Sequence, residues 1–227
     1  METQDILGRL DDLIQSRSIL EHPFYVAWQK GELTRDQLAT YARIYYPHVQ
    51  AFPQYLESAI AGTHDTFIQE ELEDNLQDEL TDPKPHPEMW LDFAAGLDVE
   101  EDVVVDGPAH EAATNMVSTF ERLTANGTAS AVTALYAYES QQPDVSRQKA
   151  EGLQEFYGVD DANTLAYFEV HAEADLEHRA GERRAIARCL EDGATEEEVM
   201  DAADEALSAY WGLLDGVCQE ADIPMDC

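Results

Sequence analysis

The sequence has few basic residues, few cysteines and no long apolar run. Only 13 of its 227 residues are Lys or Arg, against 48 Asp and Glu, so it offers no basic stripe for nucleic acid. The cysteines Cys189, Cys218 and Cys227 are odd in number and clustered late, which excludes a disulfide framework. No window approaches 18 uncharged apolar residues, and the N-terminus lacks an apolar signal segment. We therefore expect a cytoplasmic protein that binds neither nucleic acid nor membrane.

The acidic residues are spread along the chain and give a formal net charge of −35. Salt screens the repulsion between such charges, so the composition predicts a surface adapted to high salt. A cationic partner is the alternative, but no segment localises a patch for one. The apolar content of 44 % is enough for a substantial core and argues against disorder.

Helical periodicity covers nearly the whole chain, and no segment alternates convincingly as a strand. The expected helices span residues 6–17, 33–62, 67–80, 87–97, 110–126, 129–142, 145–158, 164–190 and 196–221. We expect Thr34 to cap the second helix, Pro47 and Pro53 to kink it, and Gly127 to be the C-cap of the fifth helix. Seven to nine helices with short connections predict an all-α bundle. It would form a single domain over residues 1–227, with an acidic C-terminal tail from about 216.

The segment 164–190 places charged residues on what should be its buried stripe. At about 100° per residue, His171, Asp175 and His178 point the same way as the apolar residues, and Glu182 follows one turn on. A buried charge is expensive unless it is paired or binds metal. Two imidazoles and a carboxylate at positions i, i+4 and i+7 can converge on a metal ion. The alternative is a charged surface helix in a very acidic protein.

Further candidate ligands lie on other segments. Glu139 sits on an apolar, alanine-rich helix face, and Glu79 continues a leucine stripe seven residues before His86. Taken singly, Glu79 is typical of a surface residue and His86 of a helix cap. Together with the histidine-rich stripe they fit a dinuclear iron or manganese site in a bundle. The proposed ligand set is Glu79, His86, Glu139, His171, Asp175 and His178. Its spacing differs from the paired Glu-x-x-His of ferritin-like proteins, so that fold is not implied.

The other four histidines are expected to be capping or surface residues: His22, His48, His64 and His110. For His48, which follows Pro47 in the long second helix, a position near an internal cavity is the alternative.

Motifs along nearly the whole chain resemble one family. The stretches are LEHPFYVAWQKGELTRDQL, YARIYYPHVQAFPQYLESAI, HPEMWLDFAAGL, ALYAYESQQPDVSRQKAEGLQEFYG and AYFEVHAEADLEHR. They resemble the chlamydial protein associating with death domains and its archaeal and bacterial relatives. This is a branch of the haem-oxygenase-like dimetal oxidases, related in fold to pyrroloquinoline-quinone biosynthesis protein C and the TenA thiaminases. The resemblance implies a haem-oxygenase-like helical bundle, and all six ligand positions of the family hold the expected residue types here.

The resemblance also implies a reaction. Members of this branch are described as making p-aminobenzoate for folate, with the ring taken from one of the protein's own tyrosines and the amino group from a lysine. By motif, the sacrificed tyrosine matches Tyr25, a second participating tyrosine matches Tyr41 and the donor lysine matches Lys149. The implied cofactors are two metal ions, Fe/Fe or Mn/Fe, together with O2 and an external reductant. Such a reaction would give at most one turnover per chain.

Two other classes of function stay open. The first is a catalytic dimetal oxygenase that acts on a diffusible amine, fatty acid or amino acid with the same ligands. The second is a binding protein without redox chemistry, similar to TenA or to pyrroloquinoline-quinone biosynthesis protein C. Measuring the metal content would distinguish this class from the two oxygenase classes. Without the resemblance, Tyr25 and Tyr41 are typical of core aromatic residues. The sequence leaves open the metal pair, the reductant and whether two copies form a homodimer.

Overall fold

The computed structural model describes residues 2–225, and within that range it contains helices and no strand. Its nine longer helices are α1 (Glu2–Ser16), α3 (Arg35–Gly62), α4 (Thr66–Thr81), α5 (His86–Gly96), α7 (Glu111–Thr124), α8 (Thr128–Glu139), α9 (Gln142–Phe156), α10 (Ala162–Glu191) and α11 (Glu196–Glu220). The short elements are α2 (Pro23–Gln29), α6 (Glu101–Val105) and a 3-10 turn, Ile19–Glu21. The all-α prediction is confirmed, and the seven to nine predicted helices correspond to the nine longer ones.

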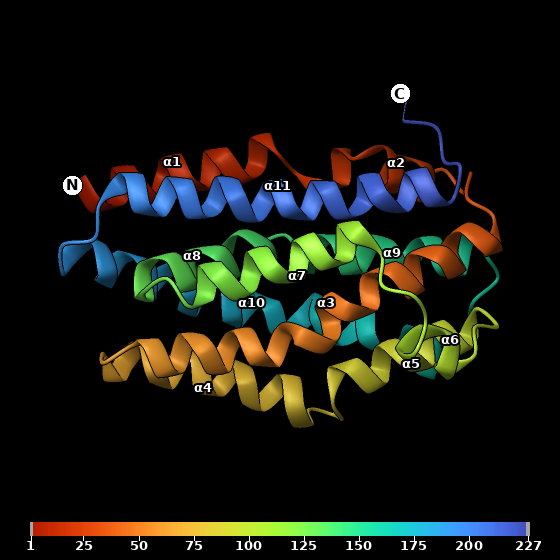
Figure 1. Ribbon diagram of the computed structural model, residues 1–227, viewed down its shortest axis with the longest axis horizontal. Coiled ribbons are helices and arrows are strands. Elements are labelled where there is room, and N and C mark those ends of the chain that lie inside the picture. The colour runs from red at the N-terminus through yellow and green to blue at the C-terminus, as the bar shows by residue number, and fades with distance from the viewer. Residues whose placement is uncertain (1, 226–227) are drawn as a thin grey trace.

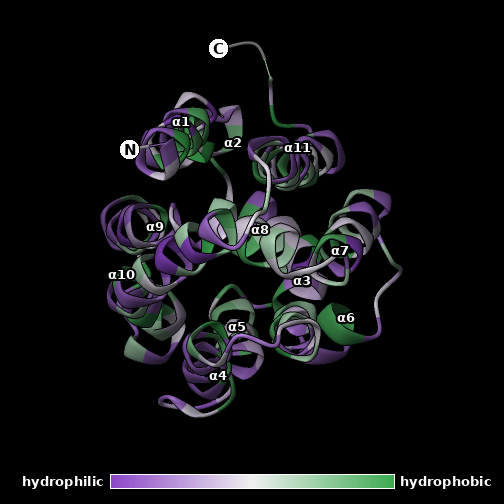
Figure 2. Cartoon of the chain, turned by 90° about the vertical axis from the view of Figure 1, so that its left-hand side faces the viewer, coloured by the Kyte–Doolittle hydropathy of each residue, from purple (hydrophilic) through white to green (hydrophobic). Residues whose placement is uncertain are grey.

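The helices run roughly parallel or antiparallel in layers. Both views of the molecule place α1 and α11 on one side and α4 and α5 on the opposite side (Figure 1 and Figure 2). Helix α10 packs against α4, α5, α8, α9 and α1, so most of its length has neighbours on several sides. The charged stripe of this helix therefore faces the interior of the bundle. No helix within residues 2–225 is long and apolar enough to cross a membrane.

The long helix α3 begins where the sequence predicts. Thr34 forms a capping box with Gln37, in which each side chain bonds the other residue's backbone N–H. The helix continues through Pro47 and Pro53 to Gly62. Its inner face carries a row of buried aromatic residues, and these residues build the centre of the core.

Two predicted boundaries are wrong. Helix α8 ends at Glu139 instead of residue 142, and Pro143 lies in the first turn of α9, where the missing proline N–H needs no helical partner. Gly127 does not cap α7, whose C-cap is Ala125. It precedes α8 as the N-cap residue with φ +92°, a conformation that favours glycine.

The C-terminal tail begins later than the predicted position near residue 216. Helix α11 continues to Glu220, because Val217 and Cys218 are buried against the rest of the bundle. Ile223 is also buried. Cys227 lies outside the described residues.

Three of the four remaining histidines match their predicted roles. The side chains of His22 and His110 accept hydrogen bonds from backbone N–H groups at the starts of α2 and α7, and His64 is exposed. His48 is instead fully buried in α3, and burial lowers its pKa from the usual value to about 3. Its ring packs edge-on against Tyr138, which lines the small cavity described below.

Candidate metal centre and tyrosine cluster

The six predicted ligands come together inside the bundle as two groups of three. We call Glu79, His86 and His171 the first group, and Glu139, Asp175 and His178 the second group. Within each group, one nitrogen or oxygen atom of each residue lies within 4.8 Å of those of the other two. Residues from both groups line the same small internal cavity, so the two groups are neighbours. A dinuclear centre requires such a pair of adjacent sites.

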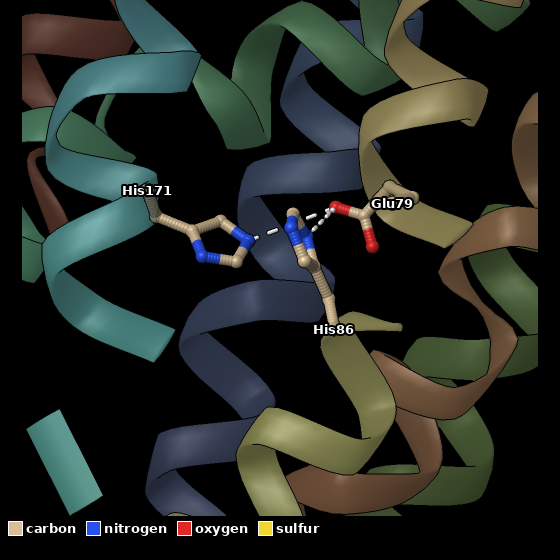
Figure 3. Close-up of side chains that lie close together, drawn as sticks. All are labelled: Glu79, His86 and His171. Atoms are coloured by element: carbon tan, nitrogen blue, oxygen red, sulfur yellow. Dashed lines mark ion pairs between the residues drawn. The ribbon is translucent and has the colours of Figure 1, made fainter. Parts of the chain in front are cut away.

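The first group is assembled from three helices (Figure 3). Glu79 lies near the end of α4, His86 is the first residue of α5, and His171 is on α10. The Nδ1 atom of His86 is 2.9 Å from Oε1 of Glu79, and Nε2 of His171 is 3.6 Å from the same oxygen. The proline-rich turn between α4 and α5 brings Glu79 and His86 together. Glu79 is only 4 % exposed, so the interpretation of this residue as a surface side chain is wrong.

The second group joins the end of α8 to the middle of α10. The Nδ1 atom of His178 is 3.4 Å from Oδ1 of Asp175 and 3.8 Å from Oε1 of Glu139. Asn75 on α4 donates from its side-chain nitrogen to both oxygens of Glu139, each at 3.0 Å. Asn75 therefore fixes the orientation of the Glu139 carboxylate, a role that the sequence analysis did not identify.

Each of the three imidazoles donates its outer N–H to an oxygen. The pairs are His86 Nε2 with the Asp82 carbonyl at 3.2 Å, His171 Nδ1 with the Tyr167 carbonyl at 2.6 Å, and His178 Nε2 with the Asp78 carboxylate at 3.0 Å. A carbonyl oxygen only accepts, so in the neutral ring the inner nitrogen keeps its lone pair. This is the tautomer that binds metal, and metal-binding histidines are commonly held by such outer acceptors.

Several buried donor atoms of the two groups lack hydrogen-bond partners. Within residues 2–225, Nδ1 of His86, Nδ1 of His178 and Oδ2 of Asp175 have no hydrogen-bond partner. These are donor atoms that metal coordination would satisfy, and carboxylate with imidazole is a set that suits iron and manganese. The residues present therefore fit a pair of such ions.

The pKa shifts in the two groups follow from burying carboxylates and imidazoles side by side. Burial would raise the pKa of Glu79, but His86 and His171 together hold that pKa well below its usual range. Burial would likewise lower the pKa of His178, but Asp175 and Glu139 raise it to about 10. In the second group, burial raises the pKa of the Glu139 carboxyl.

Lys149 is buried in an aromatic cage. Its side chain is 1 % exposed, and its Nζ atom lies 5.2 Å from the ring centres of Tyr25 and Tyr41 and 5.3 Å from those of Tyr45 and Phe168. The Nζ atom donates a hydrogen bond of 2.7 Å to the Tyr41 hydroxyl. Within residues 2–225 it forms no ion pair, and burial lowers the pKa of Lys149 well below its usual value. The side chain is thereby favoured as a neutral amine.

Tyr25 belongs to a buried group of tyrosines, here called the hydroxyl cluster: Tyr25, Tyr41, Tyr45, Tyr138 and Tyr210. The Tyr25 hydroxyl lies 3.4 Å from those of Tyr41 and Tyr210, and the hydroxyls of Tyr45 and Tyr138 are 2.8 Å apart. Tyr138 directly precedes the candidate ligand Glu139 and lines the cavity between the two ligand groups. The cluster thus extends from the metal-binding region to Tyr25.

The structure brings Tyr25, Tyr41 and Lys149 together as the motif resemblance implies. No sequence pattern marks Tyr45, Tyr138 or Tyr210 as functional. Tyr210 lies on α11, far along the chain from the other members, and its hydroxyl accepts from Gln142 at 3.3 Å. Only the packing of α11 against α2, α3 and α8 reveals this neighbourhood.

Comparisons with known proteins agree with a redox centre. A family described as iron-containing redox enzymes matches residues 39–211. The 4-aminobenzoate synthase of Chlamydia trachomatis serovar D is 40 % identical over 212 residues, covering 93 % of this chain and 91 % of the relative. The 4-aminobenzoate synthase of Nitrosomonas europaea is 36 % identical over 227 residues, covering 96 % of this chain and 92 % of the relative.

Solved structures share the fold. A TenA homologue from Pseudomonas syringae pv. tomato has a TM-score of 0.80 and 18 % identity, covering 95 % of this chain and 92 % of its own. A CADD-like protein from Nostoc punctiforme has a TM-score of 0.77 and 20 % identity, covering 99 % of this chain and 100 % of its own. A protein with a haem-oxygenase-like fold from Shewanella denitrificans has a TM-score of 0.75 at 16 % identity, covering 98 % of this chain and 94 % of its own. The predicted haem-oxygenase-like, TenA-like bundle is confirmed.

Proposed function

Since this chain belongs to the family of iron-containing redox enzymes, we propose that it makes 4-aminobenzoate from its own Tyr25 and Lys149. Four relatives named 4-aminobenzoate synthase, at 36–40 % identity, align with more than nine-tenths of the chain. The observation that carries the proposal is the burial of Lys149 against Tyr41 and Tyr25, within a cluster of tyrosines that reaches the candidate metal ligands.

The proposed metal centre uses all six converging side chains. Glu79, His86 and His171 would hold one ion, and Glu139, Asp175 and His178 the other, as an iron pair or a manganese–iron pair. When bound, such a pair supplies the redox chemistry that activates O2, with electrons from an external reductant. The protein contributes fixed ligands, oriented imidazoles and a small cavity lined by buried residues.

The chemistry of the product sets what the two side chains must do. 4-Aminobenzoate carries an amino group where tyrosine has its phenol oxygen, and a carboxyl group where tyrosine has Cβ. The Cα–Cβ bond of Tyr25 must therefore break, and Cβ must be oxidised to a carboxyl group. The nitrogen of Lys149 must form a bond to the ring carbon that carries the phenol oxygen, and that oxygen leaves as water. The bond between this nitrogen and Cε must also break, which leaves Cε oxidised to an aldehyde. O2 is the oxidant and the external reductant completes the electron balance.

The burial of Lys149 prepares its nitrogen for that role. A protonated amine has no lone pair, whereas the neutral form that burial favours can attack an electron-poor ring. Because Lys149 donates to Tyr41, an N–H bond is used for positioning and the lone pair stays free. The Nζ atom is 5.2 Å from the centre of the Tyr25 ring, close enough for the two side chains to meet after a small movement.

The site favours an internal substrate over a diffusible one. The cavity shared by the two ligand groups is small and is lined by Tyr138 and Tyr167 as well as by the ligands. Within residues 2–225, the larger grooves are open to the surface, and the candidate ligands do not line them. A catalytic oxygenase that acts on a diffusible molecule would use the same ligands and is the second candidate. The alternative of a non-enzymatic binding protein conflicts with membership of a redox enzyme family.

Isotope labelling tests the proposal directly. Protein carrying ring-labelled tyrosine and side-chain-nitrogen-labelled lysine is given metal, reductant and O2, and released 4-aminobenzoate is analysed by mass spectrometry. We expect product with both labels from the native protein. Tyr25→Phe should abolish it while metal content is retained, because the Tyr25 hydroxyl lies outside the ligand set.

Tyr46→Phe is the matched control, because Tyr46 lies on the same helix as Tyr41 but outside the hydroxyl cluster. This variant should release product like the native chain. Product from Tyr25→Phe, or product without the ring label, would assign the activity to a diffusible substrate.

A further inference from the structure

Glu182 is a buried carboxylate that the six-ligand site does not use. It lies on α10, one turn beyond His178 and on the same inward stripe. The residue is 3 % exposed, yet neither oxygen of its carboxylate has a hydrogen-bond partner within residues 2–225. A buried polar group without a partner is costly, so its presence requires an explanation.

The carboxylate of Glu182 lies against the second ligand group. It lies close enough to the carboxylates of Glu139 and Asp175 for their negative charges to repel its own. The neighbouring Arg183 does not neutralise it, because that guanidinium pairs with Asp11 at 2.9 Å. None of the ion pairs formed by the described residues provides a Lys or Arg partner for Glu182. Glu182 thus adds a third buried carboxylate beside those of Glu139 and Asp175, next to the group that these two form with His178.

We propose that Glu182 is a fourth protein ligand of the second metal ion, beside Glu139, Asp175 and His178. A cation there would be coordinated by the unpartnered oxygens of Glu182. Its positive charge would also offset the mutual repulsion of the three carboxylates. The inference rests on the dinuclear centre proposed above and adds to it a residue outside the six-residue set. It also makes the two sites unlike. The first has one carboxylate and two imidazoles, and the second has three carboxylates and one imidazole.

Metal titration tests the role of Glu182 without an activity assay. Chelator-treated full-length protein is titrated with Mn²⁺ by calorimetry, and bound metal is counted by mass spectrometry after desalting. We expect two ions per native chain and one per Glu182→Gln chain. The second affinity should fall by about 100-fold or more, because losing even an outer partner of a ligand typically costs 10–100-fold. Glu177→Gln, an exposed position on the same helix, should bind two ions like the native chain.

Thermal stability distinguishes a ligand from a residue that only supports the fold. Without metal, Glu182→Gln should melt above the native protein, because it removes one of three buried carboxylates. With saturating Mn²⁺ the native protein should instead have the higher melting temperature, because metal binding stabilises the variant less. A residue with a purely structural role would lower both melting temperatures together.

Two results would overturn the inference. One is a Glu182→Gln chain that binds two Mn²⁺ ions with native affinities. The other is a crystal structure of the metal-loaded native protein with both Glu182 oxygens well beyond about 2.2 Å, the usual carboxylate–metal distance, from the second ion. Native protein that binds two ions but releases no 4-aminobenzoate would refute the proposed reaction and leave this role of Glu182 intact.

Discussion

The Nζ atom of Lys149 donates a 2.7 Å hydrogen bond to the hydroxyl of Tyr41 inside a cage of aromatic rings. Within residues 2–225 it has no acidic partner, although the chain carries 48 Asp and Glu. The protein keeps only three lysines and buries one of them away from every carboxylate, and this burial lowers the pKa of the amine and disfavours its protonated form. Burying the amine in this way costs folding free energy, and the proposed chemical role of Lys149 would account for that cost.

Replacing Lys149 by Met should stabilise the protein at neutral pH, and the gain should shrink as the pH rises. Because the folded-state pKa of Lys149 is lowered, the unfolded chain binds one more proton between that pKa and about 10.4, the ordinary lysine value. The native free energy of unfolding therefore rises by about 1.4 kcal/mol per pH unit in this window, and Lys149→Met lacks this rise.

Urea unfolding of both proteins from about pH 6 to pH 9.5 would measure the difference. The control is Lys30→Met, since Lys30 is exposed and its replacement should leave the pH dependence unchanged. A constant difference between native protein and Lys149→Met across this range would mean that the buried amine is not neutral.

Metal should stabilise the fold through the six converging ligands. A ligand that binds only the folded state at 100 times its Kd adds about 2.7 kcal/mol. We expect Fe²⁺ or Mn²⁺ to raise the Tm of chelator-treated protein in calorimetry, and His171→Ala to lose a large part of this rise. His64→Ala, an exposed histidine away from the groups, should keep all of it. If metal raises the Tm of His171→Ala as much as that of the native protein, His171 is not a metal ligand.

The sequence predicts the candidate metal ligands better than their surroundings. His171, Asp175 and His178 stand out because charge on an otherwise apolar helical stripe is rare, and the stripe of α10 is indeed buried. Glu79 and His86 could be identified only as a pair, since the turn between their helices decides whether they meet. Their convergence depends on tertiary packing that periodicity does not describe.

The hydroxyl cluster was harder to predict for a definite physical reason. Helix α8 is buried on all sides, so no stripe distinguishes its inward residues. Within it, Tyr136 bonds Asp11 of α1, whereas Tyr138 bonds Tyr45 at the centre. Two residues on the same helix thus have unlike roles that composition and spacing alone cannot separate.

The large negative charge predicts a dependence on salt. With a formal charge of −35, repulsion between surface carboxylates destabilises the folded chain, and added ions screen it. The Tm should rise as KCl increases from about 0.1 M into the molar range, where the screening length falls to about 3 Å. Scanning calorimetry at fixed pH measures this. A Tm that is flat or falls over the range would favour a dedicated cationic partner instead of adaptation to salt.

The yield of product should be limited to one molecule per chain, because the proposed reaction would consume Tyr25 and Lys149. We expect released 4-aminobenzoate to approach the concentration of metal-loaded protein and then stop, even with excess O2 and reductant. Peptide mapping of spent protein should show a loss of mass at Tyr25 and at Lys149, in proportion to product. Tyr46 serves as the internal reference and should be unchanged. Many turnovers per chain with intact Tyr25 would show that the metal centre acts on a diffusible substrate, since a consumed side chain cannot react twice.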